Sequence, residues 1–272
     1  MKQMFAALAL VVTLPLTAQV AEGDAHWNAR AEGEQNGHAK AAQIDAAIAA
    51  YQKAVAANPN DLEAHWKLLR AIRFKGAYVA STNDEKKAVY GLAKKAGEAA
   101  LAHVPSKGNE KQVADTARSI AGAGEIYFWD SVNWGEWALA YGKLAAVKEG
   151  AADRIRRGAT IAMLIDPKME DGGPARVLGR LHDQTPHVPF ITGWASSKDA
   201  VKYLTESLKV DAANKITKVF LAEALVNNDS DNKPKAIQML REVVSAPNPP
   251  EYVVEWEAAV NDARALLRKW GA

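Results

Sequence analysis

From about Ala39 onward, apolar residues recur three and four positions apart in alanine-rich segments, which short breaks of Asn, Asp, Gly and Pro separate. This spacing is typical of consecutive amphipathic helices. In the segment 198–210, Val201, Leu204 and Leu208 fall on one helical face, while lysine and glutamate fall elsewhere. Alternation typical of strands is scarce. The pattern therefore predicts an all-α chain in which each helix buries one face against a neighbour.

Local signals predict where several helices begin. Thr82 with Glu85, and Ser196 with Asp199, have the spacing of a capping box, in which a side chain accepts from a backbone N–H at the helix start. Pro250 suits the first turn of the last helix. The helices expected from these signals cover residues 86–102, 198–210 and 251–270.

A pattern of four residues repeats along the chain. Ala47, Tyr51, Ala54 and Pro59 are followed by turn residues and then by a new helix with Trp66. Small first and third residues let two helices approach closely, and the larger second residue fills the groove between them. The same spacing recurs in Ala200, Leu204, Ser207 and Ala212, in Ala236, Leu240, Val243 and Asn248, and more weakly in Ala140, Leu144 and Val147.

This pattern resembles the tetratricopeptide repeat, a helix-turn-helix unit of about 34 residues that stacks into a superhelix. The resemblance implies an irregular superhelical stack of helical hairpins, that is, a tetratricopeptide-like α-solenoid. The alternative is a plain bundle of alanine-rich helical hairpins whose spacing agrees by chance. The uneven intervals between the repeats favour an irregular stack.

Residues 1–21 have the three-part pattern of a secretory signal peptide. One lysine precedes an apolar run over residues 4–16, and small and polar residues follow it. The run is shorter than the roughly 20 residues that span a bilayer. We expect cleavage after Ala18 or Ala21, which leaves residues 22–272 as a single tetratricopeptide-like domain without an integral membrane span. We expect this domain in the bacterial periplasm, with secretion from the cell as the alternative.

The composition narrows the function classes. Lys and Arg number 34 against 32 Asp and Glu, a net charge of +2, and no basic run stands out. The chain therefore lacks the electrostatic footprint of a nucleic-acid-binding protein. The absence of cysteine excludes disulfides, thiolate catalysis and thiolate zinc sites. Because hydrolase and metalloprotease signatures are missing as well, we expect a non-enzymatic binding protein without cofactor or metal.

An aromatic segment over residues 126–137 is the first candidate site. It holds Trp129, Trp134 and Trp137, and Asn133 begins an Asn-Trp-Gly sequence that predicts a turn. In one interpretation these side chains hold a helical hairpin together; in the other, part of the cluster lines a cavity for an apolar ligand. The sequence leaves both interpretations open.

Two arginines form the second candidate site. Gly172 and Gly173 lack the spacing of a phosphate-binding loop, and Pro174 after them predicts the start of a helix. Arg176 and Arg180 are four residues apart and so share a face of this helix. Their guanidinium groups are suited to an anionic ligand or partner, unless nearby carboxylates pair with them.

The order of these motifs resembles the T-component family of tripartite ATP-independent periplasmic (TRAP) transporters. The resemblance covers about residues 113–244: the aromatic segment, then Gly-Gly-Pro-Ala-Arg-Val-Leu-Gly-Arg-Leu, then a proline-containing loop that ends at Trp194. It implies a periplasmic helical protein that assembles with copies of itself and engages a solute-binding protein. A general periplasmic interaction scaffold is the alternative. The resemblance also implies a central cavity shaped by the Gly-Gly-Pro stretch and the loop after it. The candidate residues for binding a ligand or partner are therefore Trp129, Asn133, Trp134, Trp137, Gly173, Arg176, Gly179, Arg180 and Trp194.

Overall fold

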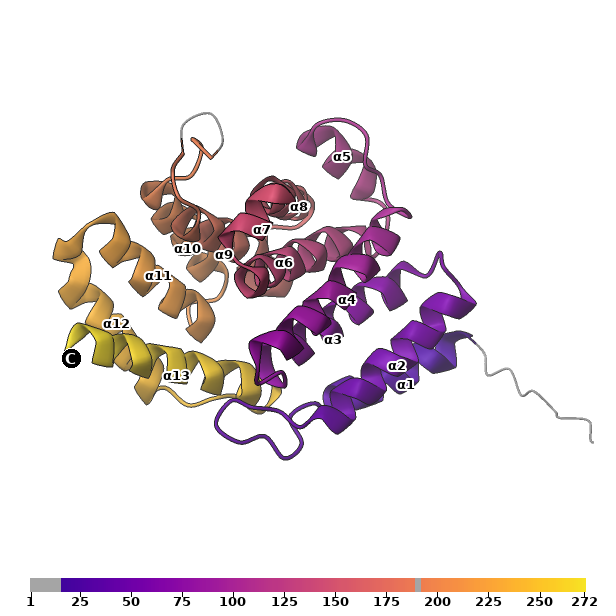
Figure 1. The fold of residues 1–272 in the computed structure, drawn as a ribbon, viewed down its shortest axis with the longest axis horizontal. Coiled ribbons are helices and arrows are strands. Elements are labelled where there is room, and N and C mark those ends of the chain that lie inside the picture. The colour runs from indigo at the N-terminus through magenta and orange to yellow at the C-terminus, as the bar shows by residue number, and fades with distance from the viewer. Residues whose placement is uncertain (1–15, 189–191) are drawn as a thin grey trace, which may run out of the picture.

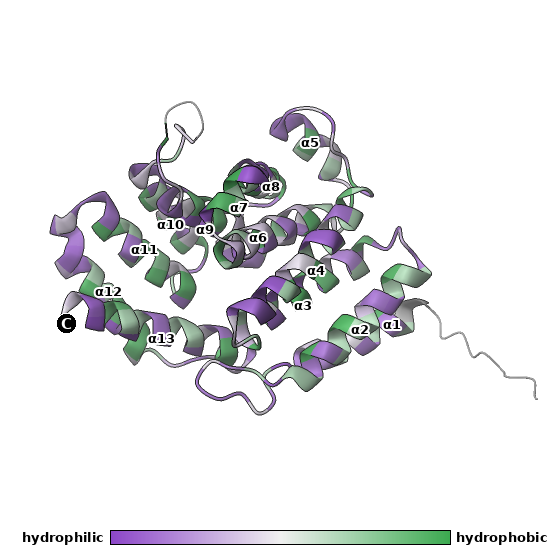
Figure 2. Cartoon of the chain, viewed as in Figure 1, coloured by the Kyte–Doolittle hydropathy of each residue, from purple (hydrophilic) through white to green (hydrophobic). Residues whose placement is uncertain are grey.

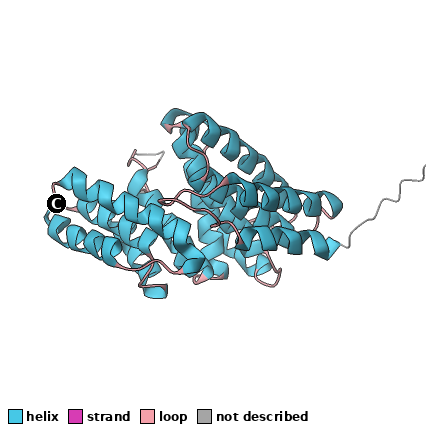
Figure 3. Ribbon diagram, turned by 90° about the horizontal axis from the view of Figure 1, so that it is seen from below, coloured by secondary structure: helices cyan, strands magenta, loops and turns pink. Residues whose placement is uncertain are grey.

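The structure, a computed structural model, describes residues 16–188 and 192–272. This part of the chain forms thirteen α-helices, two short 3-10 turns and no strand (Figures 1 and 3). The first seven helices are α1 Leu16–Asn28, α2 Ala41–Ala57, α3 Leu62–Tyr78, α4 Asn83–Leu101, α5 Glu110–Ala117, α6 Ala123–Tyr141 and α7 Lys143–Lys148. The others are α8 Ala151–Ile165, α9 Met169–Gln184, α10 Ser197–Val210, α11 Lys215–Asn228, α12 Lys233–Ser245 and α13 Val253–Trp270.

The predicted capping residues lie at the helix starts, although α4 and α10 begin earlier than predicted, at Asn83 and Ser197, and α13 begins later, at Val253. Thr82 accepts from the backbone N–H of Glu85, and the Glu85 side chain accepts in return at the start of α4. Ser196 accepts from the N–H of Asp199 at the start of α10. Pro250 opens a 3-10 turn that leads directly into α13. Local capping therefore fixes the register in which these helices enter the core.

The repeated pattern marks the core. All three of Ala47, Tyr51 and Ala54 are 0% exposed on α2, and the matching positions of α10 and α12 are buried as well. The prediction of a weaker repeat at Ala140, Leu144 and Val147 is wrong. Leu144 is 86% and Val147 66% exposed, because α6 ends at Tyr141 and these residues lie on the separate short helix α7.

The predicted turn at Asn133-Trp134-Gly135 is also wrong. Helix α6 runs unbroken through these residues, and a side chain at Gly135 would meet nothing within 4 Å. The chain reverses farther on, around Gly142 and Gly150, whose φ angles are 89° and 65°. These left-handed conformations suit glycine, which is why the reversal occurs there.

Five helices form a closed inner ring. Helix α3 packs against α6, α6 against α9, α9 against α11, α11 against α13, and α13 against α3 (Figure 1). The outer helices α4, α8, α10 and α12 each pack against two successive members of this ring. The result is a stack of helical hairpins whose end returns to its beginning.

The segment predicted to be a signal peptide falls mostly outside the described residues. Residues 1–15 are not described, and residues 16–21 form the first turns of α1. Val20 on this helix is 8% exposed and belongs to the core that α2 and α3 share. In the described part of the chain, every helix is too short or too polar to cross a membrane.

Candidate functional site

Charged side chains join neighbouring helices of the ring to one another and to the segment that follows α1. Arg73 on α3 donates to Glu136 on α6 at 3.1 Å. Arg30, just after α1, pairs with Glu255 on α13 at 2.9 Å. Together with Arg70 on α3 and Arg176 on α9, whose charges interact with theirs, Arg30 and Arg73 form a group that we name the inner arginine cluster. Burial lowers the pKa of Arg176; the charge of Glu170 opposes this shift, and the charge of Arg73 adds to it.

Arg70 lies between two tryptophan rings and, unlike Arg30 and Arg73, has no ion pair among the described residues. Its guanidinium carbon lies 3.9 Å from the ring centre of Trp27 and 4.9 Å from that of Trp66. Its Nε atom is buried and has no hydrogen-bond partner among the described residues. Burial lowers the pKa of Arg70, and Glu170 opposes this shift. Cation–π attraction, with no direct carboxylate pair, therefore keeps this cation in place.

A left-handed turn in α9 holds Glu170, whose charge affects that of Arg70. Glu170, Asp171 and Gly172 all have positive φ, at 47°, 56° and 78°. For residues other than glycine this conformation costs about 1–2 kcal/mol each. Arg176 offsets part of that cost by donating to the backbone carbonyls of Glu170 at 3.0 Å and Asp171 at 3.3 Å. Burial raises the pKa of Glu170, while the charges of Arg70 and Arg176 oppose the rise.

Three of the four aromatic-segment candidates pack α6 against its neighbours. Asn133 is 2% exposed and donates to the carbonyls of Leu69 on α3 and Trp129. Trp134 is 2% exposed, edge-on to Trp137, and lies beneath the cations of Lys94 and Arg154. This geometry supports a structural role within the helix packing. The ligand role stays a prediction.

Trp129 is less enclosed than the other aromatic candidates. It is half-buried and edge-on to Phe128, with ring centres 4.9 Å apart. Its Nε1 atom is buried without a hydrogen-bond partner in the described part of the chain. Its indole N–H is therefore unused in this structure.

The glycine candidates allow close helix packing. A Cβ at Gly173 would lie 2.7 Å from the ring of Phe128, and one at Gly179 would lie 2.5 Å from Leu204. Both positions therefore bring α9 close to its neighbours α6 and α10. As predicted, regular helix begins after Gly172, with Pro174 in the first turn.

The two arginines of α9 have separate environments. Arg176 donates to backbone carbonyls and to Thr217 on α11 at 3.2 Å. Arg180 pairs with Glu223 at 2.6 Å and with Asp183 at 3.2 Å. The structure therefore favours the alternative in which both guanidinium groups have partners within the chain. Binding of an anionic partner by this pair stays a prediction.

Trp194 lies in a different part of the molecule, beside the start of α10. Its ring is edge-on to His182, and Arg156 lies 4.6 Å from its ring centre. Together with Tyr203, these residues line an open hollow of about 440 Å³. His182 accepts from the backbone N–H of Ser196 through Nδ1, and burial lowers its pKa. The imidazole is therefore a neutral ring between two aromatic side chains.

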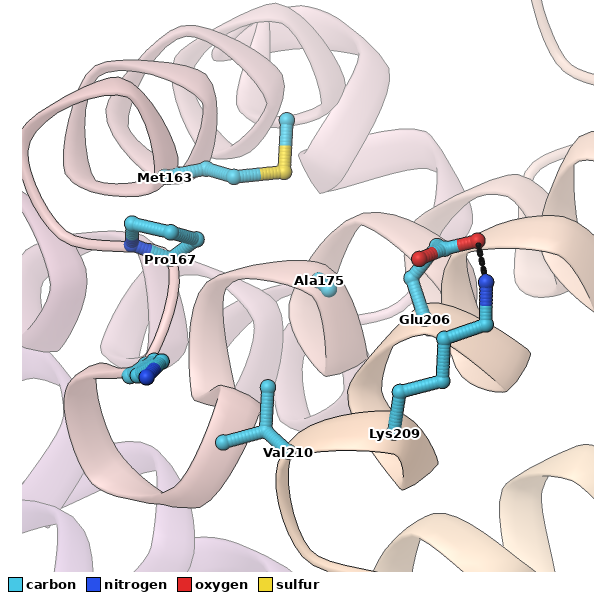
Figure 4. A pocket seen from close by; sticks show the side chains of 7 residues that line it. Met163, Pro167, Ala175, Glu206, Lys209 and Val210 are labelled. Atoms are coloured by element: carbon cyan, nitrogen blue, oxygen red, sulfur yellow. Dashed lines mark hydrogen bonds and ion pairs between the residues drawn. The ribbon is translucent and has the colours of Figure 1, made fainter.

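A second hollow of about 510 Å³ opens between α8, α9 and α10 (Figure 4). Met163, Pro167 and Val210 form its apolar wall, and a Lys209–Glu206 pair at 2.6 Å closes one side. Neither hollow includes a member of the inner arginine cluster. The described residues contain no group of three or more His, Asp or Glu placed to hold a metal ion.

Sequence reasoning did not select Arg70, Arg73 or Trp27. One signal was available: Trp66 and Arg70 are four residues apart and Arg73 follows at three, which puts them on one face of α3. A stripe of aromatic and basic residues on one helix is the pattern that could have selected them. Trp27 and Glu170 come from distant segments, and only the folded chain brings them to this face.

No family model and no curated protein matches the sequence. Among solved structures, the chain is similar to a thermophilic tetratricopeptide-repeat protein of Thermus thermophilus, with a TM-score of 0.54 and 15% identity over 91% of this chain and 100% of that one. The TPR2AB domain of yeast Sti1, solved in a complex with pHSP90, gives 12% identity over 92% and 98% but a TM-score of only 0.29, too low to indicate a common fold. The chain therefore has the all-α fold of a tetratricopeptide-repeat solenoid.

Proposed function

We propose that this chain is a non-enzymatic scaffold that binds a segment of a partner protein on the inner side of its helical ring. The observation that carries this proposal is Arg70, held between Trp27 and Trp66 with a buried Nε that no described residue satisfies. A guanidinium that is already partly desolvated and held by aromatic rings loses less hydration when it binds a carboxylate than a fully exposed one does. Stacked helical repeats commonly bind partners on the inner face.

The left-handed turn supports the same location. Backbone strain persists where surrounding structure holds it, and it concentrates at functional sites. Glu170 and Asp171 are held in that turn opposite Arg70, and Tyr252 donates to Asp171 at 3.2 Å. A partner segment would therefore meet both the Arg70 guanidinium and the desolvated Glu170 carboxylate, which favours a polar, charged peptide.

The proposal also includes export of the chain to the periplasm and its association with a transporter. The signal-like pattern of residues 1–21 supports export to the periplasm, and the motif order over residues 113–244 supports association with a TRAP transporter. Cleavage after Ala18 would leave the buried Val20 in the mature chain, whereas cleavage after Ala21 would remove it. The intact mass of the protein recovered from the cell envelope distinguishes these products from an uncleaved chain.

A comparative pull-down from periplasmic extract tests the proposal. The wild-type chain, Arg70→Gln and Arg241→Gln are the baits, and mass spectrometry identifies the proteins that each retains. Arg241 is exposed on the outer helix α12 and serves as the matched control. We expect the wild type and Arg241→Gln to retain the same partner and Arg70→Gln to lose it, with melting midpoints confirming that all three baits are folded.

Each result has a definite meaning. A solute-binding protein among the retained partners supports the transporter version, and another protein supports the general scaffold. Equal retention by Arg70→Gln contradicts binding at the inner arginine cluster. If a small molecule is retained without any protein, the result contradicts the scaffold and supports ligand binding by the aromatic candidates on α6.

A further inference from the structure

Helix α7 turns its large apolar side chains away from the protein. Leu144 is 86% exposed and Val147 is 66% exposed, while the small residues Ala145 and Ala146 pack against the core. Leu139, shortly before this helix on α6, is 67% exposed. Figure 2 shows α7 as a hydrophobic segment at the near side of the ring. An amphipathic helix in a stable monomer normally has the opposite orientation.

This apolar surface protrudes, in contrast to the two hollows described above. Gly142 and Gly150 bracket α7, both have positive φ, and a Cβ at either would meet nothing within 4 Å. None of the exposed apolar residues of α7 lines either hollow. A convex apolar tip fits a soft, deformable apolar phase better than it fits a flat protein surface.

The charges beside the tip are basic. Lys143 and Lys148 occupy the two ends of α7 and are both exposed. The neighbouring acid, Glu149, accepts from Lys94 on α4 at 2.9 Å, so an intramolecular partner already neutralises it. Two copies meeting through a twofold axis would bring these lysines face to face, which opposes self-association through this surface.

We propose that the α7 tip, defined as Leu139, Lys143, Leu144, Val147 and Lys148, docks onto an anionic lipid surface. Leu144 and Val147 enter the boundary between headgroups and acyl chains, while the two lysines at the helix ends stay at the level of the anionic headgroups. The surface is separate from the inner arginine cluster, so a partner segment and a membrane can be bound together. The membrane contact places the ring with α7 toward the bilayer.

Sedimentation with lipid vesicles tests this proposal. The protein is used as purified from the cell, with its N-terminus determined by mass so that all variants share it. Vesicles of phosphatidylcholine with about one-third phosphatidylglycerol are compared with vesicles of phosphatidylcholine alone. We expect binding to the anionic vesicles that weakens as salt is raised, because the lysine contribution is screened.

Two double variants separate the apolar and the basic contributions. We expect Leu144→Ser with Val147→Ser to lower the partition coefficient at least tenfold, and Lys143→Gln with Lys148→Gln to lower it by about tenfold or more. The matched control is Leu164→Ser with Val210→Ser, which removes a leucine and a valine that are 37% and 39% exposed elsewhere. We expect the control to bind like the wild type.

Because the chain contains no cysteine, a single introduced cysteine can be labelled specifically, which allows fluorescence to report on the position of the tip. Leu144→Cys carries a single environment-sensitive fluorophore, and its emission is expected to shift to the blue on anionic vesicles, whereas a label on Val210→Cys is expected not to shift. Equal binding by the wild type and the Leu144→Ser/Val147→Ser variant, or no shift at position 144, overturns the proposal. A concentration-dependent dimer that this double variant abolishes in light scattering also overturns it, because the tip would then bind a second copy.

Discussion

Arg30 and Glu255 form an ion pair at 2.9 Å although 225 positions separate them in the sequence. Both side chains are nearly buried, at 10% and 13% exposure, and Arg30 also donates to the backbone carbonyl of Glu251. Close by, a Cβ at Gly37 would lie 2.6 Å from the backbone nitrogen of Ala258. These contacts join the last helix of the stack to the loop after the first, and they close the solenoid into a ring.

Replacing Arg30 by Gln is expected to open this closure. The substitution leaves the Glu255 carboxylate in a mostly buried place without its partner, which costs about 3 kcal/mol of unfolding free energy. Urea denaturation measures that loss, and small-angle X-ray scattering is expected to show a larger radius of gyration as α13 separates from α3. Arg264→Gln is the control, because its contact with Glu257 is long at 3.4 Å and Arg264 is 47% exposed. An unchanged radius in both variants would show that the apolar contacts alone close the ring.

Local chemistry accounts for the parts of the fold that the sequence predicts correctly. Thr82 caps its helix through a residue three positions away, and Ala47, Tyr51 and Ala54 face one neighbour because they share a helical face. Such relationships depend on spacing along the chain and can be read without coordinates. The pair Arg30–Glu255 depends on the cumulative curvature of all the intervening helices, so spacing carries no signal for it.

The errors have an equally physical cause. Asn133-Trp134-Gly135 has the composition of a turn, but burial of Trp134 and the bonds from Asn133 to α3 favour a continuous helix over the local preference. The apolar residues of α7 continue the repeated pattern in the sequence, yet the reversal at Gly142 rotates them away from the core. In the candidate site, the glycines and arginines of α9 could be selected from the sequence by residue type. The approach of Glu170 to Arg70 could not be predicted, because it depends on how distant helices pack.

Overpacking tests the repeat alignment. Ala200 is 0% exposed, and its backbone carbonyl lies where Gly179 lets α9 approach α10. Ala200→Leu is expected to lower the unfolding free energy by about 1–3 kcal/mol, because the added methyl groups have no space at this contact. Ala88→Leu, at an exposed position of α4, is the control and is expected to change stability little. Equal melting midpoints for both variants would contradict the close contact between α9 and α10.

A buried carboxyl group predicts a dependence of stability on pH. Asp130 on α6 is 7% exposed, and its Oδ1 has no hydrogen-bond partner within the described residues. Burial raises the pKa of Asp130 from 3.8 to about 7 although Arg154 opposes the shift. Between these two pH values the folded chain keeps the proton that the unfolded chain releases. Stability therefore falls as pH rises through this interval, by on the order of 4 kcal/mol in total.

Asp130→Asn removes that titration and isolates its effect. The variant is expected to have nearly the stability of the wild type near pH 4 and to exceed it by a few kcal/mol at pH 8. Urea denaturation at both pH values measures the difference, with Asp84→Asn, whose side chain is 95% exposed, as the control. A difference between Asp130→Asn and the wild type that is independent of pH would show that the carboxyl has the same pKa in the folded and the unfolded chain.

Substitutions of the two arginines of α9 distinguish a residue that holds the left-handed turn in place from a residue that contacts the partner. Arg176→Met leaves the carbonyls of Glu170 and Asp171 without their donor, and we expect a loss of about 2 kcal/mol of stability with faster amide exchange in the left-handed turn. Arg180→Met breaks pairs with Glu223 and Asp183, whose side chains are 24% and 0% exposed. Gln184 and Asn227 still donate to Asp183 in this variant, so we expect a loss of about 1–2 kcal/mol. If Arg180→Met abolishes binding of the partner found by pull-down while the variant stays folded at the assay temperature, Arg180 contacts that partner directly. If only Arg176→Met weakens it, and in proportion to the exchange in the turn, Arg176 acts by holding Glu170 opposite Arg70, and the paired guanidinium face predicted from spacing alone is contradicted.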